Sequence, residues 1–351
     1  MKIAICTDAW SPQVNGVVTT LTRTCEELRK AGHEVEVFSP SSGFLTFPLP
    51  SYPEIRLPLL PRRRLGRLLD AFSPDCVHIA TEGTLGLAAR AHCRQRGWRF
   101  TTSYHTQFPE FVNARLPFIK VEFIYRLLRW FHGGATRTMV ATPQMREQLV
   151  RYGFRRLGMW GRGVDTTLFS PKKRKTTDLP QPVWVYAGRL AVEKNLPAFL
   201  ALDLPGSKLI IGDGPARASL QKEFPAAHFT GYRFGEDLAC WLASADVFVF
   251  PSRTDTFGLV MLEAMASGLP VAAFPVTGPV DVVKEGLSGC LREDLREACL
   301  AALQLDWEEA RSAALECSWT SAARQFESHL VPVHAARRLP LRSRLLSGLT
   351  S

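Results

Sequence analysis

The sequence lacks the features that mark several large classes of protein. Its 351 residues contain no stretch close to the roughly 20 apolar residues that a membrane-spanning helix needs. Apolar residues make up 46% and charged residues 22% of the chain, values that exclude a disordered or collagen-like polymer. Residues 1–6 run directly into a strand pattern, so we expect no signal peptide and a cytoplasmic protein.

Metal-binding and redox spacings are also missing. The eight cysteines form no C-x-x-C pair, and the eight histidines show neither H-x-x-x-H nor H-E-x-x-H spacing. We therefore expect buried, reduced thiols, no metal and no cofactor. Zinc-finger spacing, an RNP-type motif and a basic-zipper heptad are absent as well, so we expect no nucleic-acid partner.

Positive charge is concentrated in the first half of the chain. The net charge is +10 overall; residues 1–160 hold 22 basic and 12 acidic residues, whereas residues 161–351 hold 21 of each. This asymmetry indicates an anionic partner for the basic half. An anionic membrane surface and an anionic small molecule both fit.

Short β-branched runs alternate with helical patterns along the chain. The strand pattern recurs near residues 2–8, 34–39, 75–80, 99–104, 138–141, 183–187, 208–211, 247–250 and 271–274. Such alternation predicts α/β architecture with parallel sheets covered by helices. We predict two doubly wound, Rossmann-like domains facing a cleft. The predicted parts are a first domain at 1–168, a polar, proline-bounded linker at 169–182, a second domain at 183–318, a C-terminal helix at 319–336 and a basic tail at 337–351.

Candidate binding residues gather where predicted strands end, since ligands of doubly wound sheets bind at that edge. After the first strand, Asn15-Gly16 stands before a helix; its bare backbone suits phosphate, although an ordinary strand-to-helix turn explains it equally well. In the second half, Arg189 and Lys194 follow the strand near 183–187 and can converge on one anion.

A further junction spans residues 251–271. Asp255 lies in a loop of small residues, a helix opens at Gly258, and Glu263 follows eight residues after Asp255. The loop N–H groups and the helix end can bind an anion or sugar oxygens, and both carboxylates can accept hydrogen bonds from hydroxyls.

Taken in order over residues 1–330, these motifs resemble the retaining glycosyltransferases of family 4, which have the GT-B fold. Asp255 and Glu263 match that family's E-x7-E element, and Gly188-Arg189 with Lys194 accompany them. The family commonly has glutamate at the first position, so Asp255 is one methylene shorter than usual. Residues 80–86 and 103–109 resemble the bacterial mannosyltransferase and glycolipid-synthase branch.

The resemblance implies that a nucleotide-diphosphate sugar, GDP-mannose or a UDP-hexose, binds mostly against the second domain. Arg189 and Lys194 are expected to neutralise the leaving diphosphate without a metal. Glu263 is expected to bind the ribose hydroxyls, and His105 to make a polar contact at the reaction centre. Asp255, with Thr256, Phe257, Gly258 and Leu259, is expected to hold the donor sugar, while Gly16 lets the first domain approach the phosphate.

The resemblance places the acceptor, a lipid or lipid-linked glycan, in the first domain. Arg62, Arg63, Arg64, Lys120 and Arg126 are expected to contact it or an anionic membrane from the inner face, since residues 115–131 combine apolar and basic side chains as interfacial helices do. For that segment, a core helix with a solvated basic face is the alternative.

Transfer with retention is expected by front-face substitution. Two other functions stay open from sequence: a non-hydrolysing sugar-nucleotide epimerase of similar fold, and a non-catalytic module that binds a nucleotide sugar or a lipid.

Overall fold

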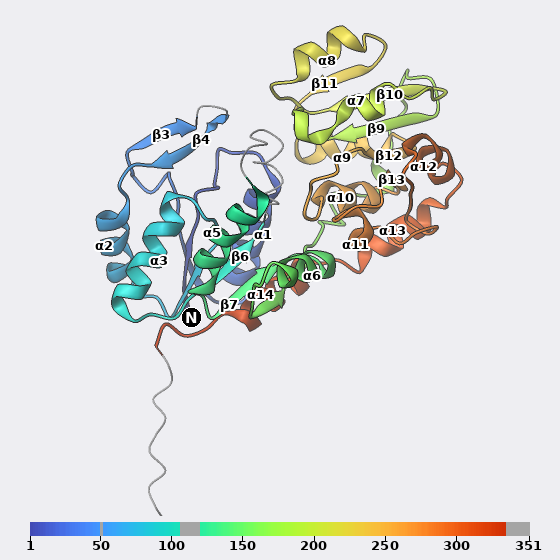
Figure 1. Cartoon of the computed structure of the whole chain (residues 1–351). Helices are drawn as coiled ribbons and strands as arrows, with labels where there is room; N and C mark the ends of the chain where they lie inside the picture. The colour runs from blue at the N-terminus through green and yellow to red at the C-terminus, as the bar shows by residue number, and fades with distance from the viewer. Residues whose placement is uncertain (50–51, 106–119, 335–351) are drawn as a thin grey trace, which may run out of the picture.

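Two six-stranded parallel sheets form the centres of two domains in the computed structural model, which describes residues 1–49, 52–105 and 120–334 (Figure 1). The elements of the first domain are β1 (Lys2–Cys6), α1 (Gly16–Lys30), β2 (Glu34–Phe38), β3 (Thr46–Leu49), β4 (Tyr52–Pro58), α2 (Arg62–Phe72), β5 (Cys76–Ile79), α3 (Thr84–Arg96), β6 (Thr101–Tyr104), α5 (Val121–Gly133), β7 (Arg137–Val140), α6 (Pro143–Arg151) and β8 (Leu157–Met159). Its sheet has the strand order β2-β1-β5-β6-β7-β8.

The second domain repeats the plan with the strand order β11-β10-β9-β12-β13-β14. Its strands are β9 (Val183–Ala187), β10 (Ser207–Ile211), β11 (His228–Gly231), β12 (Val247–Phe250), β13 (Val271–Ala273) and β14 (Gly289–Leu291). The helices from here to the end of the chain are α7 (Leu196–Leu200), α8 (Arg217–Glu223), α9 (Gly235–Ala243), α10 (Leu259–Ala266), α11 (Pro279–Val282), α12 (Leu295–Ala302), α13 (Trp307–Leu315) and α14 (Trp319–His329), with short 3₁₀ turns at Pro171–Lys173 and Val192–Lys194.

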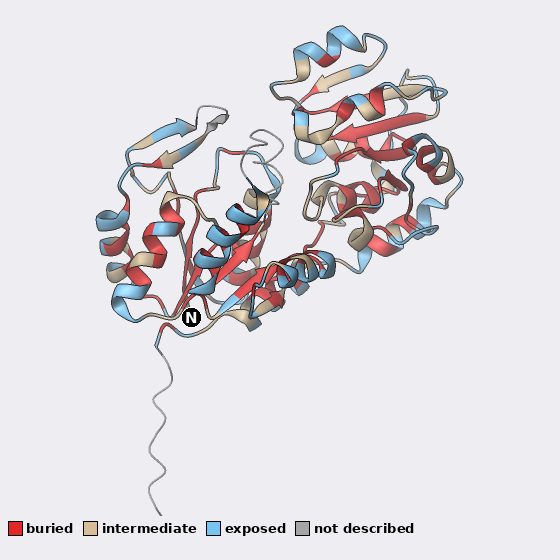
Figure 2. Ribbon diagram, viewed as in Figure 1, coloured by how far each residue is buried: buried red, intermediate tan, exposed pale blue. Residues whose placement is uncertain are grey.

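Each sheet reverses its strand order beside its own first strand, between β1 and β5 in one domain and between β9 and β12 in the other. In doubly wound sheets, ligands bind outside the carboxyl ends of the strands at this reversal. The central strands of both sheets are buried, whereas the edge strands β2 and β11 are only partly buried and the helices expose their outer faces (Figure 2). These features confirm the two doubly wound domains expected from the sequence.

The last helix, α14, returns to the first domain. It packs against α1, and the ring of Phe326 lies 4.8 Å from that of Trp160 and 4.7 Å from that of His78. Beyond the helix, the N–H of Val333 donates to the oxygen of Asp75 at 2.8 Å. The predicted C-terminal helix therefore crosses back, and the basic tail predicted at 337–351 lies outside the described residues.

The linker segment is attached to the second domain. Val164 and Phe169 belong to that domain's core. Arg174 pairs with Asp246 at 2.9 Å, and the N–H of Lys175 donates to the hydroxyl of Ser244. The chain is thus attached to the second domain from Val164 onward, first by side chains in its core and then by polar contacts at Arg174 and Lys175.

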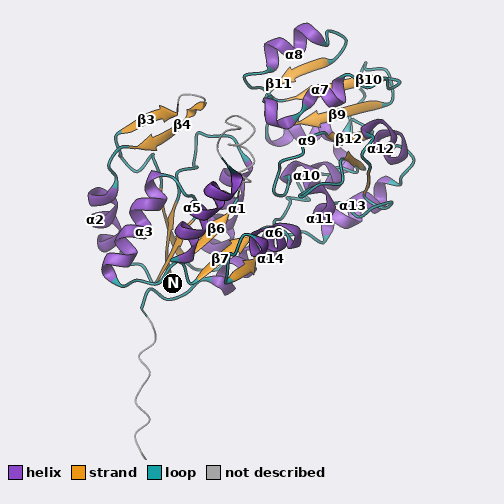
Figure 3. Ribbon diagram, viewed as in Figure 1, coloured by secondary structure: helices purple, strands orange, loops and turns teal. Residues whose placement is uncertain are grey.

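The β3–β4 hairpin was not predicted from the sequence. It forms a separate antiparallel pair apart from the six-stranded sheet (Figure 3). Pro48 and Pro58 lie within its strands, and prolines argue against a central strand because they lack an N–H for the ladder. A two-stranded hairpin has two outer edges where that donor is not needed.

We predict that Phe326→Ala destabilises the first domain. The side chain is fully buried, so its loss leaves a cavity and lowers the free energy of unfolding by about 3–5 kcal/mol. Urea unfolding followed by circular dichroism measures this. Leu315→Ala removes a half-exposed side chain from α13 and should change the free energy of unfolding by only about 0.5 kcal/mol. Equal effects of the two variants would contradict the docking of α14.

Candidate active site

Residues that follow the innermost strands of both sheets line one cleft between the domains. The cleft has a volume of about 780 Å³. Asp8 follows β1, Glu82 follows β5, Arg189 follows β9 and Asp255 follows β12. Ten residues predicted from the sequence line this cleft, namely Gly16, His105, Arg189, Lys194, Asp255, Thr256, Phe257, Gly258, Leu259 and Glu263.

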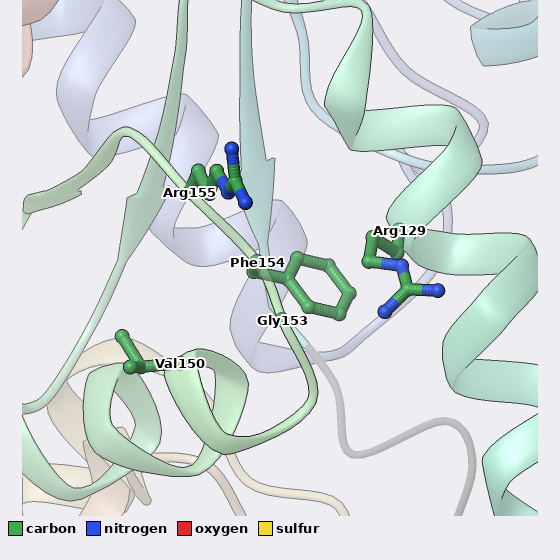
Figure 4. Close-up of a pocket in the computed structure, with 5 residues that line it drawn as sticks. All are labelled: Arg129, Val150, Gly153, Phe154 and Arg155. Atoms are coloured by element: carbon green, nitrogen blue, oxygen red, sulfur yellow. The ribbon is translucent and has the colours of Figure 1, made fainter.

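A second hollow lies elsewhere, on the outer surface of the first domain. It has a volume of about 610 Å³ and is lined by Arg129, Val150, Gly153, Phe154 and Arg155 (Figure 4). None of these residues lines the cleft or was predicted as a site residue. We therefore place the chemistry in the cleft.

The turn into α10 brings residues 254–258 to the cleft. We call this segment the donor loop, because the family resemblance predicts that it holds the donor sugar. Gly258 has φ +81, a left-handed conformation that favours glycine. A Cβ there would lie 2.7 Å from Met261 Cε, so a side chain would also collide with the first turn of the helix. Glycine at this position lets the chain reverse sharply and present the loop backbone to the cleft.

Lys194 and Asp255 form an ion pair across the second domain's part of the cleft. Lys194 Nζ donates to Asp255 Oδ1 at 2.6 Å. Burial alone would raise the pKa of Asp255, but the adjacent Lys194 charge and its hydrogen bond outweigh burial and lower it. Asp255 is therefore ionised at neutral pH, which suits an acceptor of hydroxyl hydrogen bonds.

Glu263 lies on α10 with its side chain in the cleft. Burial raises its pKa to about 7, and Arg23 opposes that rise in part. The carboxyl consequently changes charge within the physiological range. A ligand whose hydroxyls donate to the ionised form would pull the equilibrium toward it.

Gly16 begins α1 directly opposite the second domain. A Cβ on Gly16 would lie 3.5 Å from Leu259 Cδ1, so the two domains already approach closely at this point. The Asn15 side chain accepts from the N–H groups of Val17 and Val18, both at 3.0 Å. The helix end is therefore capped by Asn15, and fewer free N–H groups face the cleft than the sequence suggested.

His105 is held on both ring nitrogens by its own domain. Arg162 Nη2 lies 3.3 Å from Nδ1, and Ser103 Oγ lies 2.8 Å from Nε2. Because a guanidinium only donates, Nδ1 accepts and Nε2 carries the proton. Burial, Arg162 and two nearby histidines hold the pKa of His105 well below its usual value, so the ring is neutral.

The atom that His105 offers across the cleft is its main-chain oxygen. The hydroxyl of Thr256, in the donor loop of the second domain, donates to it at 2.6 Å. This hydrogen bond joins the two domains at the floor of the cleft. The contacts of the His105 ring thus help to hold the His105 main-chain oxygen in place for this hydrogen bond.

Sequence reasoning missed two buried charges in the cleft. Asp8 accepts hydrogen bonds from the N–H groups of Leu85 and Gly86, so its carboxylate lies at the start of α3. Arg162 lines the cleft while only 7% exposed. In the sequence, Asp8 is a single charge beside a predicted strand end, and Arg162 is a single charge between Gly161 and Gly163. Neither pattern by itself indicated a binding residue.

The predicted acceptor and membrane residues do not line the cleft. Arg62, Arg63 and Arg64 form the exposed first turn of α2. Lys120 caps α5 and Arg126 lies on the exposed face of that helix. The rest of the predicted segment, residues 115–119, lies outside the described residues.

Clusters of three or more potential metal ligands do not occur within residues 1–49, 52–105 and 120–334. In the same ranges, every helix is too short or too polar to cross a bilayer. All eight cysteines are free and at least partly buried, as expected from their spacing.

Comparison with known proteins identifies the family. A family described as Glycosyltransferase Family 4 matches residues 14–168, and Glycosyl transferases group 1 matches residues 181–305. A GDP-mannose-dependent alpha-mannosyltransferase from Mycobacterium tuberculosis is 34% identical over 315 residues, covering 83% of each chain. The chain belongs to glycosyltransferase family 4. This glycosyltransferase transfers a sugar from a nucleotide-sugar donor.

Other relatives of the glycosyltransferase are named for different sugars, and one of them is named for a diacylglycerol product. The sulfoquinovosyl transferase of Arabidopsis thaliana is 31% identical and covers 79% of this chain and 60% of its own length. An alpha-monoglucosyldiacylglycerol synthase from Streptococcus pneumoniae is 26% identical, covering 86% of this chain and 78% of its own.

Solved structures show the same two-domain GT-B fold. Sucrose-phosphate synthase from Thermosynechococcus elongatus has a TM-score of 0.74 at 20% identity, covering 93% of this chain and 97% of its own. Anabaena HepE in complex with UDP-glucose has a TM-score of 0.70 at 15% identity and covers 93% and 98%. At these identities the likeness shows the fold of the glycosyltransferase.

We predict that nucleotide-sugar affinity of the glycosyltransferase rises between pH 6 and pH 8, with a midpoint near the Glu263 pKa of about 7. The ionised carboxylate accepts hydroxyl hydrogen bonds more strongly. Glu263→Gln should weaken binding at pH 8 and flatten this dependence, while changing turnover at saturating donor less. Calorimetric titration across pH measures it.

The same variant has a stability signature. Because the folded-state pKa of Glu263 lies above its unfolded value, stability falls as pH rises from about 4.5 through 7. Glu263→Gln should therefore raise the melting temperature at pH 8 and leave it nearly unchanged at pH 4. A parallel shift at both pH values would contradict the assigned pKa.

Proposed function

We propose that this enzyme moves a hexose from GDP-mannose or a UDP-hexose to a hydroxyl of a lipid or lipid-linked glycan, with retention and without a metal. The observation that carries the proposal is the composition of the cleft. Its second-domain side brings together Arg189, Lys194, Asp255 and Glu263. Its first-domain side presents Gly16 and the main-chain oxygen of His105.

The second-domain residues suit the three parts of a nucleotide sugar. Arg189 and Lys194 supply positive charge for the diphosphate as it leaves, the role that a divalent cation would otherwise fill. Glu263, on α10, suits the ribose hydroxyls. Asp255 and the backbone at Thr256 lie beside His105, where the transferred sugar would meet the acceptor.

A front-face mechanism fits the carboxylate arrangement. A double displacement needs a free carboxylate nucleophile at the anomeric carbon. Asp255 is instead paired with Lys194, and Asp8 accepts the N–H groups at the start of α3. The leaving phosphate itself would then help to deprotonate the acceptor hydroxyl, and the product would keep the configuration of the donor.

A donor and acceptor screen tests this function. GDP-mannose, UDP-glucose and UDP-glucuronate are offered with diacylglycerol and lipid-linked acceptors, and product stereochemistry is read by NMR. Transfer with inversion, or turnover abolished by EDTA, would contradict the proposed mechanism. Interconversion of the donor without transfer would favour the epimerase, and binding without turnover would favour the non-catalytic module.

We predict that Arg189→Ala and Lys194→Ala each reduce turnover by about 10²–10³-fold at saturating donor, since each removes positive charge that acts as the diphosphate leaves. Both side chains line the cleft, so the fold should be retained. Circular dichroism and a melting curve provide the control. Near-normal turnover in both variants would exclude the assigned role.

We further propose that the enzyme acts on the inner face of the membrane as a peripheral, cytoplasmic protein. Names of relatives, including a diacylglycerol glycoside synthase, support a lipid acceptor. Beside Arg62–Arg64, Leu59 and Leu60 are 57% and 87% exposed. On α5, Phe123, Leu127 and Trp130 are about half exposed and share one face. Exposed apolar groups beside arginines suit an anionic lipid interface.

The three arginines of α2 give a second argument. They occupy its first turn, which contains no acidic residue. Positive charge is unfavourable there because the helix dipole is also positive at its N-terminus. An anionic surface would offset this unfavourable interaction between the arginines and the helix dipole.

We predict that replacing Arg62, Arg63 and Arg64 with serine weakens sedimentation with anionic liposomes about 10–100-fold, since each basic residue near an anionic leaflet contributes about 1 kcal/mol. Nucleotide binding should be unchanged. The matched control replaces Lys222, Arg292 and Arg296 with serine. These substitutions remove the same amount of charge from the exposed surface of the second domain. Equal binding to neutral and anionic liposomes, or equal losses in both triple variants, would contradict this surface.

A further inference from the structure

Arg162 is a buried cation in the cleft, and no carboxylate among residues 1–49, 52–105 and 120–334 pairs with it. Its Nη1 donates to the main-chain oxygens of Trp160 at 2.6 Å and Gly161 at 3.0 Å, and Nη2 donates to the His105 ring at 3.3 Å. The guanidinium also lies over the Trp160 ring at 4.5 Å. These partners are all neutral, and Arg162 forms no ion pair with any carboxylate of the described residues.

Three other cations of the cleft, Arg23, Lys194 and Arg233, are paired with acids. Arg23 Nη1 lies 3.1 Å from a Glu26 oxygen and Nη2 lies 3.6 Å from an Asp165 oxygen. Lys194 lies 2.6 Å from Asp255. Arg233 Nη1, just before α9, lies 3.3 Å from an Asp237 oxygen on that helix. Arg162 therefore differs from them in charge balance, although it lines the same cavity.

Keeping such a group in place is costly without a counter-charge. Burial lowers the pKa of Arg162 to about 9, and no carboxylate opposes that effect. Moving a single ion from water into a protein interior costs roughly several kcal/mol of free energy. A ligand anion would remove that cost, and the planar guanidinium is well matched to carboxylate and phosphate oxygens.

The position of Arg162 indicates which part of the reaction it serves. It bonds to His105, whose main-chain oxygen accepts from Thr256 in the donor loop. Arg162 belongs to the first domain, whereas the cations assigned to the diphosphate belong to the second. The guanidinium thus adjoins the place where the transferred sugar and the acceptor meet.

We propose that Arg162 binds a carboxylate carried by the acceptor or by the transferred sugar, in addition to the donor diphosphate that the second domain is proposed to bind. The inference rests on the proposed function, since it takes the cleft as the place of transfer. The acceptor and the transferred sugar are the two candidate carriers of this anion. Substrate pairs that differ only in the anion distinguish between the two carriers.

The test compares the wild-type enzyme with Arg162→Gln on two such pairs. UDP-glucose and UDP-glucuronate differ at C6 of the donor sugar; glucosyl-diacylglycerol and glucuronosyl-diacylglycerol differ at C6 of the acceptor. The wild type should prefer the anionic member of one pair. Arg162→Gln should raise KM for that member about 10–100-fold and change KM for its neutral partner less than about twofold. The pair that responds identifies the source of the anion.

Three controls keep the result interpretable. Arg23→Gln removes a charge from the same cleft that acids already balance, so it should leave the preference between members unchanged. Arg162→Lys retains the charge and should keep part of the preference, which a purely structural role would not predict. Circular dichroism and UDP or GDP titration check the fold and the nucleotide site of each variant.

Equal losses on anionic and neutral members of both pairs would make Arg162 only a support for His105 and would overturn the proposal. A wild type without preference in either pair would overturn it too. Equilibrium binding of each pair is measured alongside turnover. Anion-selective binding without transfer would refute the proposed function and leave the anion site standing.

Discussion

Parallel strands all end at one edge of their sheet, and each domain of this enzyme turns that edge toward the other. The polar residues after β1, β5, β9 and β12 consequently meet in one cleft although they lie up to about 250 residues apart. The sheets determine where these polar residues lie, and the sequences of the loops after the strands determine which side chains stand there. Gly258, in a left-handed conformation with φ +81, ends the loop at residues 251–258 and fixes the direction in which it enters α10.

The two domains contribute different charged groups to the cleft. Those of the second domain can exchange their protein partners for a ligand one at a time. Lys194 is balanced by Asp255 and can transfer part of that interaction to a diphosphate without leaving an isolated charge. Glu263, with a pKa of about 7, needs hydroxyl donors to remain ionised. The first domain contributes a neutral His105 and the uncompensated Arg162. The residues proposed to bind the donor and the proposed second anion site thus lie mainly on different domains.

Much of this was visible in the sequence because it depends on local patterns. The strand near 183–187, the paired cations Arg189 and Lys194, and the spacing from Asp255 to Glu263 are short-range features, and the structure places those site residues in the cleft. The contact between His105 and Arg162 was not visible, because the two residues are 57 positions apart and meet only through tertiary packing. Likewise, the exposed Leu59 and Leu60 become a surface only once the hairpin and α2 are placed together.

The two domains touch at separate points, and this limits how the cleft can open. Thr256 bonds to the His105 oxygen within the cleft. Away from it, the N–H of Gln144 on α6 donates to Asp281 at 3.3 Å, while Thr277 donates to the Gln144 side chain at 3.2 Å. Because α14 also returns to the first domain, the chain crosses between the domains twice. A motion that widens the cleft at Thr256 would break its bond to the His105 oxygen, and Arg162 contacts the ring of that same residue. Opening the cleft at this point would therefore release one of the contacts that hold His105, while the Arg162 contact within the first domain would remain.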